Sequence, residues 1–368
     1  MKPTIIDTTL RDGEQTPGVL FSLKEKIKIA LLLDKAGVHA IEAGTPVNGK
    51  CEQEAIKEIL KLNLNADIIT WNRAVMKDIE CSLETGADII HISLPVSDLM
   101  IGDKLGKTKQ WVLEKLAAIS SIIQKEKVTF SIGAEDATRA DKHFLLDYAL
   151  LAHEAGACRL RLCDTVGIAD PFSVLDLIDR LNVLDLDLEF HGHNDLGMAT
   201  ANALAAVKAG AEAIDTTVMG LGERAGNTPL EEIAMALRVN MGTDAGIKPE
   251  LMKTLAKTVS AAARRPISRG KSVVGDDIFA HESGIHIDGM TKNPVTYEPY
   301  NPKLVGAIRK FVIGKHSGPK AVLQKIEELR CCSDSESMRW AVPKIRKIAA
   351  IQKGGISDEQ ILGILAPH

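Results

Sequence analysis

Eight segments with the same internal order, a strand-like run followed by a helix-like stretch, succeed one another between residues 4 and 241. The first strand-like run starts at Thr4, and the later ones end near Ala43, Trp71, Leu94, Gly133, Cys163, His191 and Val218. Eight such units in close to ~250 residues are typical of a closed (β/α)8 barrel, the TIM barrel. An open doubly wound sheet is the alternative α/β architecture, but the chain has no GxGxxG or P-loop lysine motif. We therefore expect a barrel.

The strand rhythm stops near Gly242, and the remaining residues have a different pattern. Residues 249–264 indicate one amphipathic helix that ends before Pro266. Residues 271–315 are rich in glycine and histidine, and three helix-like stretches follow them. We expect a barrel domain at residues 1–243, a helix and linker region at 244–315, and a small helical subdomain at 316–368.

The loop after the first strand-like run concentrates polar side chains. Thr4 to Gly18 reads TIIDTTLRDGEQTPG, so Arg11, Asp12 and Gln15 follow the strand directly. Barrel enzymes place their catalytic groups at such strand mouths. We therefore interpret this loop as part of a site, in which Gln15 binds substrate, with a charged surface loop as the alternative.

The sequence His191-Gly192-His193 marks the end of the seventh strand. Residues two apart on a strand point to the same side, so both imidazoles are expected to face one point. Imidazole nitrogens suit zinc, manganese or iron, and an added carboxylate with open coordination positions is usual for Lewis-acid chemistry. We predict a metal site here. Two histidines that only make hydrogen bonds at a strand end remain the alternative.

Closure of the barrel makes the first and last strands neighbours, so the predicted site can draw ligands from distant segments. Asp12 would then meet His191 and His193, and Asn227 in the sequence GLGERAGN could add an amide oxygen. A Gly-Asn step at a helix start is weak evidence by itself. This donor set does not distinguish magnesium, manganese, zinc and iron.

Several other polar residues near the strand ends are candidates for binding or proton transfer. Arg11, beside the proposed ligand Asp12, could stabilise an enolate or oxyanion. Arg161 is expected to face inward and Arg73 follows the third strand, so either could receive a substrate carboxylate. For each arginine, a structural ion pair is at least as good an interpretation. Three more residues end the fifth and sixth strands at the same rim: Glu135, Asp136 and Thr165.

The tail contains two histidines, His281 and His286, in the sequence HESGIH. They are five residues apart, so this is not an HExxH zinc helix, and a metalloprotease is rejected. Either imidazole could act as a general base only if the tail folds over a barrel mouth, a condition that spacing cannot show.

The overall composition excludes several classes of function. The chain has 45 Lys and Arg against 49 Asp and Glu, a net charge of -4, so no broad cationic field invites nucleic acid or an anionic membrane. No signal peptide and no apolar run of the ~18 residues needed for a membrane span is apparent. Six cysteines without a CxxC pair argue against a zinc ribbon or a disulfide framework, and we expect a reduced, cytoplasmic location. They are Cys51, Cys81, Cys158, Cys163, Cys331 and Cys332.

Five motifs along the whole chain resemble one family of enzymes. DTTLRDGEQ, FHGHND, GLGERAGN, HESGIHIDG and GKHSG occur here in the order found in the metal-dependent Claisen-condensing enzymes. This family includes the 2-isopropylmalate, citramalate and homocitrate synthases, with 3-hydroxy-3-methylglutaryl-CoA lyase a more distant relative. The sequences LPVSDLM, EDATRAD and RLRLCDTVG look most like the homocitrate synthases of nitrogen-fixing bacteria.

The resemblance implies roles for particular residues. One divalent cation (Mg, Mn or Zn) would be held by Asp12, His191 and His193, with Asn227 completing or supporting the set, and a 2-oxo acid would chelate it. Arg11 would polarise the keto carbonyl. In the implied roles of the remaining residues, Thr165 binds the substrate carboxylate, Glu135 helps in proton transfer, and His286 with its companion Tyr297 reaches the barrel of the neighbouring subunit. The last of these implies a domain-swapped homodimer.

The activity that we expect is an acyl transfer that condenses acetyl-CoA with 2-oxoglutarate to give homocitrate and CoA. The other 2-oxo acid synthases, including a Re-type citrate synthase, are alternatives because sequence does not fix the depth of the pocket. A hydroxyacyl-CoA lyase is a weaker alternative, and a non-enzymatic metal-bound scaffold is weaker still. Because the chain stops at His368, we also expect no separate regulatory domain.

Overall fold

The computed structural model describes residues 2–329 and 335–365. The chain forms two compact units, Met1–Ile267 and Ser268–His368. The boundary between them falls inside the region at 244–315 that the sequence pattern marks as helix and linker.

The closed barrel predicted from the sequence is confirmed. Eight parallel strands pair in chain order, and β1 pairs with β8 as well as with β2, which closes the ring. Thr4 lies opposite Ala213, and Asp7 lies opposite Thr216. The strands are β1 (Thr4–Asp7), β2 (Ala40–Gly44), β3 (Asp67–Arg73), β4 (Ile89–Pro95), β5 (Thr129–Glu135), β6 (Leu160–Asp164), β7 (Leu188–Gly192) and β8 (Ala213–Thr216).

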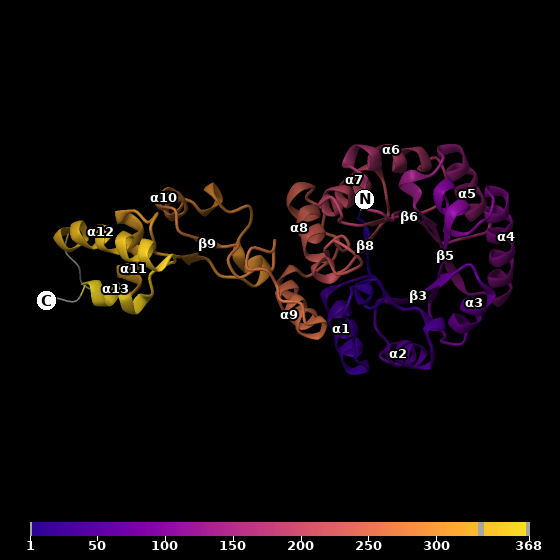
Figure 1. Cartoon of the computed structure of the whole chain (residues 1–368), viewed down its shortest axis with the longest axis horizontal. Helices are drawn as coiled ribbons and strands as arrows, with labels where there is room; N and C mark the ends of the chain where they lie inside the picture. Colours follow the sequence, from indigo (N-terminus) through magenta and orange to yellow (C-terminus); the bar gives the residue numbers. More distant parts are fainter. Residues whose placement is uncertain (1, 330–334, 366–368) are drawn as a thin grey trace. The chain divides into compact units, whose positions relative to one another are not determined.

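Helices surround the strands and cover their outer faces (Figure 1). Ser22 and Glu25 form a reciprocal capping box at the start of the first helix, and Gly37 ends it in the left-handed region with φ 93°. The barrel helices are α1 (Leu23–Ala36), α2 (Lys50–Leu60), α3 (Met76–Leu83), α4 (Lys109–Glu126), α5 (Lys142–Glu154), α6 (Pro171–Leu181), α7 (Ala199–Ala209) and α8 (Leu230–Asn240), and α9 (Met252–Ala263) follows them.

Charged side chains occupy the interior of the ring. Arg161 on β6 is 1% exposed, and its guanidinium contacts three buried carboxylates. Its Nη1 lies 2.9 Å from Glu42 Oε1 and 3.3 Å from Asp215 Oδ2, and its Nε binds Glu189. Because an isolated buried charge is costly, these ion pairs offset one another's desolvation. The inward orientation expected for Arg161 is therefore observed.

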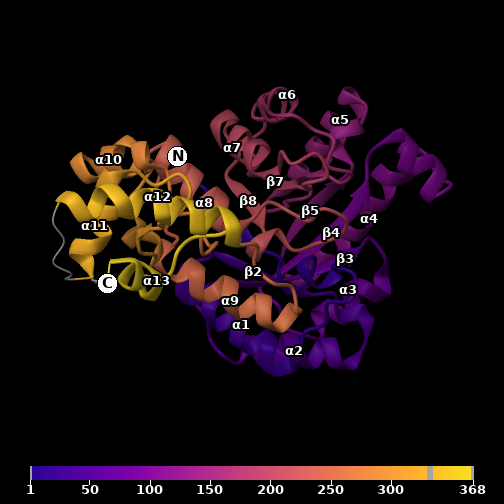
Figure 2. The ribbon, with the colours of Figure 1, turned by 60° about the vertical axis from the view of Figure 1, so that its left-hand side comes forward.

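The second unit combines a short sheet with helices, and α11, α12 and α13 lie together in it (Figure 2). Its apolar core includes Ile287, Ile313, Val322 and Ile345. The elements are β9 (Ala280–His281), α10 (Gly284–Lys292), β10 (Lys310–Phe311), α11 (Pro319–Glu328), α12 (Ser335–Gln352) and α13 (Asp358–Leu365), with β9 parallel to β10.

The two glycine and histidine motifs of the tail pack against each other inside this unit. The backbone N–H of His316 donates to Glu282 Oε1 at 3.1 Å, and the N–H of Gly284 donates to the His316 carbonyl at 3.2 Å. The Ser317 hydroxyl also contacts the Glu282 carbonyl at 3.4 Å. GKHSG therefore holds the segment that begins α10.

Within 2–329 and 335–365, no helix combines the length and the apolarity that crossing a membrane would require. Cys51, Cys81, Cys158 and Cys163 are free thiols, whereas Cys331 and Cys332 lie outside the described residues.

Asp7 at the end of β1 supplies a prediction about stability. Burial raises its pKa from 3.8 to about 7. Between these values the folded protein holds a proton that the unfolded chain has released, so stability falls as pH rises from 4 to 7. Three pKa units correspond to up to about 4 kcal/mol. The unfolding free energy of the wild type minus that of Asp7→Asn should therefore fall as the pH rises. Urea unfolding of both proteins at pH 5 and pH 8 measures this difference. A difference that does not vary with pH would contradict it.

Candidate metal centre and substrate pocket

Three metal-ligating side chains converge at one mouth of the barrel. One oxygen of Asp12 and one nitrogen each of His191 and His193 all lie within 4.8 Å of one another, and all three side chains are buried. Asp12 Oδ2 is 3.3 Å from His191 Nε2 and 3.6 Å from His193 Nε2. The barrel closure predicted from the sequence thus brings residues 12 and 191–193 together.

Hydrogen bonds to the far sides of the imidazoles orient both rings. His191 Nδ1 lies 2.8 Å from Asp215 Oδ2, and His193 Nδ1 lies 3.1 Å from the Asp164 carbonyl oxygen. A carbonyl oxygen only accepts, so His193 must carry its proton on Nδ1 and present a lone pair on Nε2. A carboxylate or carbonyl behind each imidazole is the usual support for a metal-binding histidine.

The electrostatics of the cluster favour positive charge. Burial raises the pKa of Asp12, but the Arg11 guanidinium and the two imidazoles outweigh burial and hold it well below its usual value. Burial lowers the pKa of His191, but the carboxylates of Asp215 and Asp12 raise it to about 9. A proton or a metal cation at this point is therefore stabilised, and the two compete for the same nitrogen.

Asn227 is joined to His193 of the triad through the backbone. Its backbone forms an isolated bridge with that of His193, and its Nδ2 donates to the Leu221 carbonyl at 2.8 Å. Asn227 Oδ1 and Asp12 Oδ2 are both buried and have no hydrogen-bond partner among the described residues. Orphaned buried acceptors need an explanation, and a bound cation supplies one. Two imidazole nitrogens, a carboxylate and an amide oxygen fit a divalent metal ion.

A cavity of about 240 Å³ adjoins this cluster. The residues that line it include five that the sequence predicts to bind substrate or to act in catalysis: Arg11, Gln15, Glu135, Arg161 and Thr165. The rest of its lining, beyond the three metal-ligating side chains, consists of Trp71, His91, Ser93, Cys163, Glu223 and Arg224. The structure therefore assembles most of the predicted site in one place.

Arg11 is fixed between two carboxylates. Its Nε lies 2.5 Å from Glu42 Oε2, and its Nη1 lies 3.2 Å from Asp12 Oδ1. The guanidinium also lies 5.5 Å from the centroid of the Trp71 ring. The structural ion pair and the functional placement considered from the sequence are thus both present, since a held guanidinium is a preorganised donor.

Thr165 and Glu135 lie at the rim of the cavity. The Thr165 Oγ1 accepts the backbone N–H of Asp136 at 2.8 Å, which leaves its hydroxyl proton available to donate. Glu135 Oε1 lies 2.5 Å from Lys104 Nζ, at the end of the π-helical turn Met100–Lys104 that follows β4. Both side chains can therefore exchange hydrogen bonds with a bound molecule.

Besides Asn227, three predicted residues do not line the cavity. Arg73 pairs instead with Asp78 at 2.8 and 3.0 Å, and its side chain is 61% exposed, because the first turn of α3 offers this carboxylate beside the strand end. His286 and Tyr297 belong to the second unit, where their rings stack with centroids 4.2 Å apart.

Sequence reasoning missed several polar residues of the interior. His91, Ser93 and Asp215 were not singled out, although His91 and Asp215 interrupt otherwise apolar strands in the sequences IIHISL and AIDTT. Strands of a barrel core are buried on both faces and read as apolar runs. A polar residue within such a run is the signal that could have identified them.

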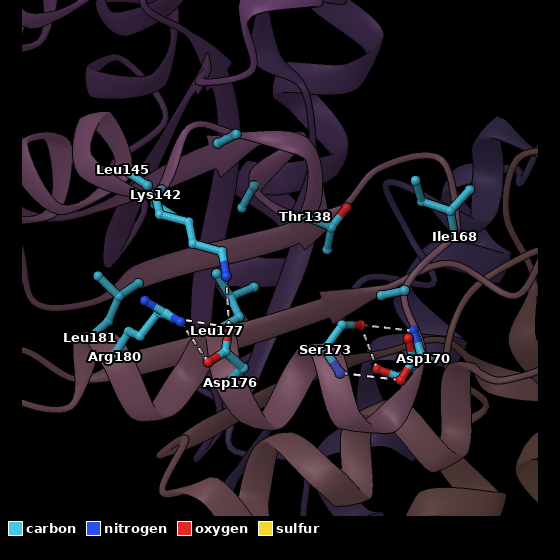
Figure 3. Close-up of a pocket in the computed structure, with 13 residues that line it drawn as sticks. Thr138, Lys142, Leu145, Ile168, Asp170, Ser173, Asp176, Leu177, Arg180 and Leu181 are labelled. Atoms are coloured by element: carbon cyan, nitrogen blue, oxygen red, sulfur yellow. Dashed lines mark hydrogen bonds and ion pairs between the residues drawn. The ribbon is translucent and has the colours of Figure 1, made fainter.

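A second cavity, of about 280 Å³, lies between α5 and α6 (Figure 3). It contains no predicted site residue. Figure 3 shows Asp176 between Lys142 and Arg180, at 3.0 and 2.9 Å. The charged groups of these three side chains thus pair with one another, and the cavity beside the metal cluster remains the better candidate for a functional site.

Two family models match the chain. One, described as HMGL-like, covers residues 2–259, and another, described as homocitrate synthase post-HMGL domain-like, covers residues 273–353. The barrel is also similar to the HMG-CoA lyase of Bacillus subtilis, with a TM-score of 0.67 over 74% of this chain and 97% of that one. At 22% identity this similarity shows the fold alone.

Curated relatives match nearly the whole chain. It is 47% identical to a 2-isopropylmalate synthase of Caldanaerobacter subterraneus, over 97% of this chain and 94% of that protein. It is 43% identical to a homocitrate synthase of Nostoc, over 99% and 97%. It is 40% identical to an (R)-citramalate synthase of Methanocaldococcus jannaschii, over 99% and 74%.

Proposed function

The chain belongs to the HMGL-like family, in the group of the 2-isopropylmalate, homocitrate and citramalate synthases, and from this premise we propose that it condenses acetyl-CoA with 2-oxoglutarate. The acetyl methyl carbon loses a proton and bonds to the keto carbon, whose oxygen takes up a proton. Water then cleaves the thioester, so acetyl-CoA, 2-oxoglutarate and water give homocitrate, CoA and a proton.

Two unpaired donors in the cavity carry the choice of 2-oxoglutarate. His91 Nε2 and Arg161 Nη2 are buried and have no hydrogen-bond partner among the described residues. Both side chains line the cavity. The Arg161 guanidinium stays charged, and burial together with this cation lowers the pKa of His91 well below its usual value. We assign to His91 the neutral tautomer in which the Ser131 hydroxyl, 2.9 Å away, donates to Nδ1 and Nε2 carries the proton.

The lack of a side chain at Gly133 on β5 keeps the space beside His91 Nε2 free of protein atoms. A Cβ at Gly133 would lie 2.7 Å from His91 Nε2 and 3.3 Å from Ser93 Oγ, so a side chain at this position would cover both polar atoms. A second carboxylate on the substrate would satisfy His91 and Arg161 together, whereas an isopropyl group would leave them buried and unpaired. A site built to hydrogen-bond its substrate discriminates strongly against an analogue that cannot do so.

The remaining residues act as binding and proton-transfer groups. A divalent cation held by Asp12, His191 and His193, with Asn227 beside them, would supply Lewis acidity to the keto group. Arg11 donates to the keto oxygen and stabilises the negative charge that develops there. Thr165 donates its hydroxyl to the substrate carboxylate. Glu135 takes up and returns protons at the cavity rim.

We include the second unit and a second subunit in the proposal. In it, His286 and Tyr297 serve the barrel of the neighbouring subunit of a homodimer, as the family resemblance implies. Their stacked rings present an imidazole and a phenol side by side, a suitable pair for proton transfer. Sedimentation of the full chain tests the dimer, and a monomer that retains full activity would overturn this part.

The test of the proposed function is a panel of 2-oxo acids. Purified enzyme with acetyl-CoA and a divalent metal is expected to release CoA fastest with 2-oxoglutarate. The similarity to a 2-isopropylmalate synthase makes 2-oxoisovalerate the competing substrate. A preference for 2-oxoisovalerate or pyruvate would reject homocitrate synthesis and retain the family. Formation of acetoacetate from 3-hydroxy-3-methylglutaryl-CoA would indicate a lyase.

His91 offers a sharper prediction about specificity. His91→Leu replaces the unpaired donor with an apolar side chain, so kcat/KM for 2-oxoglutarate should fall by roughly 5- to 150-fold, the effect of about 1–3 kcal/mol. The ratio of kcat/KM for 2-oxoisovalerate to that for 2-oxoglutarate should rise. His153→Ala, on the exposed side of α5, is the matched control. An unchanged ratio would show that His91 does not contact the distal end of the substrate.

A further inference from the structure

One arginine ties three loops of the barrel mouth together. Arg224 lies between β8 and α8, in the motif GLGERAGN, with φ 54°. Its Nε and Nη2 bind the two oxygens of Asp195 at 2.8 and 3.0 Å, and Nη2 also donates to the Thr165 carbonyl at 2.8 Å. The planar fork of a guanidinium suits such simultaneous contacts, and lysine does not reproduce it. Arg224 thus connects the loops that follow β6, β7 and β8.

The loop after β6 is shaped to receive this pair. Gly167 has φ 64°, in the left-handed region. A Cβ at this position would lie 2.3 Å from Asp195 Oδ2 and 2.9 Å from its backbone nitrogen. Only glycine therefore allows Asp195 to approach the turn that carries Thr165.

The side chain of Thr165 is held from the opposite side by the residue that follows β5. Asp136, which donates its N–H to the Thr165 Oγ1, is fully buried with φ 64°. Its carboxylate accepts the Ser97 hydroxyl and lies 2.8 and 3.0 Å from Arg139 Nε. Asp136 therefore binds the hydroxyl oxygen of Thr165, and Arg224 binds its carbonyl, so the position of the threonine is set from both sides.

We propose that Arg224 and Asp195 are positioning residues that act through Thr165 to hold the carboxylate of the 2-oxo acid. This inference rests on the proposed function. It assigns a role to two of the charged residues of the FHGHND and GLGERAGN motifs that the metal centre leaves unused, Asp195 and Arg224. Arg224 also lines the cavity and its side chain is 44% exposed, so direct contact with substrate is the competing explanation, which the experiment separates.

The experiment measures steady-state kinetics of Arg224→Ala, Asp195→Asn and Thr165→Val in the full-length protein. Each variant is expected to raise KM for the 2-oxo acid about tenfold, the size of one charge-assisted contact, and to leave KM for acetyl-CoA within about twofold. Thr165→Ser, which keeps the hydroxyl, should restore most of the loss in Thr165→Val. Arg238→Ala is the matched control, because Arg238 on α8 forms an ion pair at the surface with Asp244, 3.2 Å away.

The double variant Arg224→Ala with Thr165→Val decides between the two explanations. If Arg224 acts through Thr165, the double variant should be no worse than Thr165→Val alone, because interacting residues are not additive. Losses that multiply would assign Arg224 to direct contact and overturn the proposal, as would an unchanged KM in Arg224→Ala. Calorimetric binding of 2-oxoglutarate by the metal-loaded enzyme gives a readout independent of turnover. A wild-type enzyme that turns over no 2-oxo acid refutes the proposed function instead, and equal 2-oxoglutarate affinities of wild type and Arg224→Ala refute the positioning role alone.

Discussion

Replacing Asp12 with asparagine, or His193 with alanine, is expected to lower kcat roughly 10³-fold, because Lewis acidity at the keto group is worth several kcal/mol. The same variants should lose the bound metal, since each removes one of three converging ligands that the barrel holds within 4.8 Å. Release of CoA measures the first effect. Elemental analysis of the dialysed protein measures the loss of metal. The metal content should fall from one ion per chain to a small fraction of that.

The two readouts must change together for the metal centre to be correct. His153→Ala, an exposed histidine on α5, should leave both unchanged. Asp12→Asn preserves the shape of the side chain, so this variant should fold. The melting temperature of each variant identifies any that does not. An Asp12→Asn enzyme that folds, lacks metal and condenses at the wild-type rate would remove the metal centre from the mechanism.

Arg11→Ala is expected to lower kcat by about 10²- to 10³-fold, the usual cost of removing one preorganised donor to a developing oxyanion. Folding should survive, because Glu42 keeps two partners, Arg161 at 2.9 Å and the Thr8 hydroxyl at 2.7 Å. Arg11→Lys should fall between wild type and alanine, since an ammonium keeps the charge but loses the fork that reaches Glu42 and Asp12 at once. Pre-steady-state CoA release measures the change in rate, and circular dichroism shows whether the variant is folded.

An Arg11→Ala enzyme with a raised KM and an unchanged kcat would contradict this role. It would mean that Arg11 binds the ground state and the transition state equally. Arg238→Ala, which removes an exposed guanidinium on α8, is the control for the loss of a positive charge.

The fold and the metal cluster were predictable because their signals are local or periodic. The alternation of strand-like and helix-like stretches indicates an α/β fold, and the presence of eight such units favours a sheet that closes into a barrel. Once the ring is closed, Asp12 after β1 and the histidines at the end of β7 must meet, whatever lies between them. The spacing of His191 and His193 needs only the period of a strand.

The roles of the arginines were not predictable in the same way. Arg73 and Arg161 both belong to barrel strands, and although the sequence predicts that Arg161 faces inward, it does not tell which of the two reaches the site. The difference is made by partners distant in sequence: Glu42 and Asp215 draw Arg161 into the interior, whereas Asp78 holds Arg73 at the surface. Ion pairing depends on distances of a few ångströms, which sequence spacing does not give.

The tail shows the same limit. Its motifs HESGIH and GKHSG are separated by many residues, and sequence spacing left open what each one does. In the structure, Glu282 and His316 join the two motifs, and the stacked pair of His286 and Tyr297 lies in the same unit. Part of each motif therefore makes a structural contact. The spacing of the histidines in the sequence does not distinguish residues with this role from catalytic ones.

Restoring metal to a metal-free enzyme tests the central claim most directly. Protein stripped with a chelator is incubated with acetyl-CoA and 2-oxoglutarate, and the products are identified by mass spectrometry before and after a divalent cation is added. We expect no product without the cation, and equal amounts of CoA and homocitrate once it is supplied. Release of CoA that is the same with and without the cation, or no condensation with any 2-oxo acid in either state, would contradict the account.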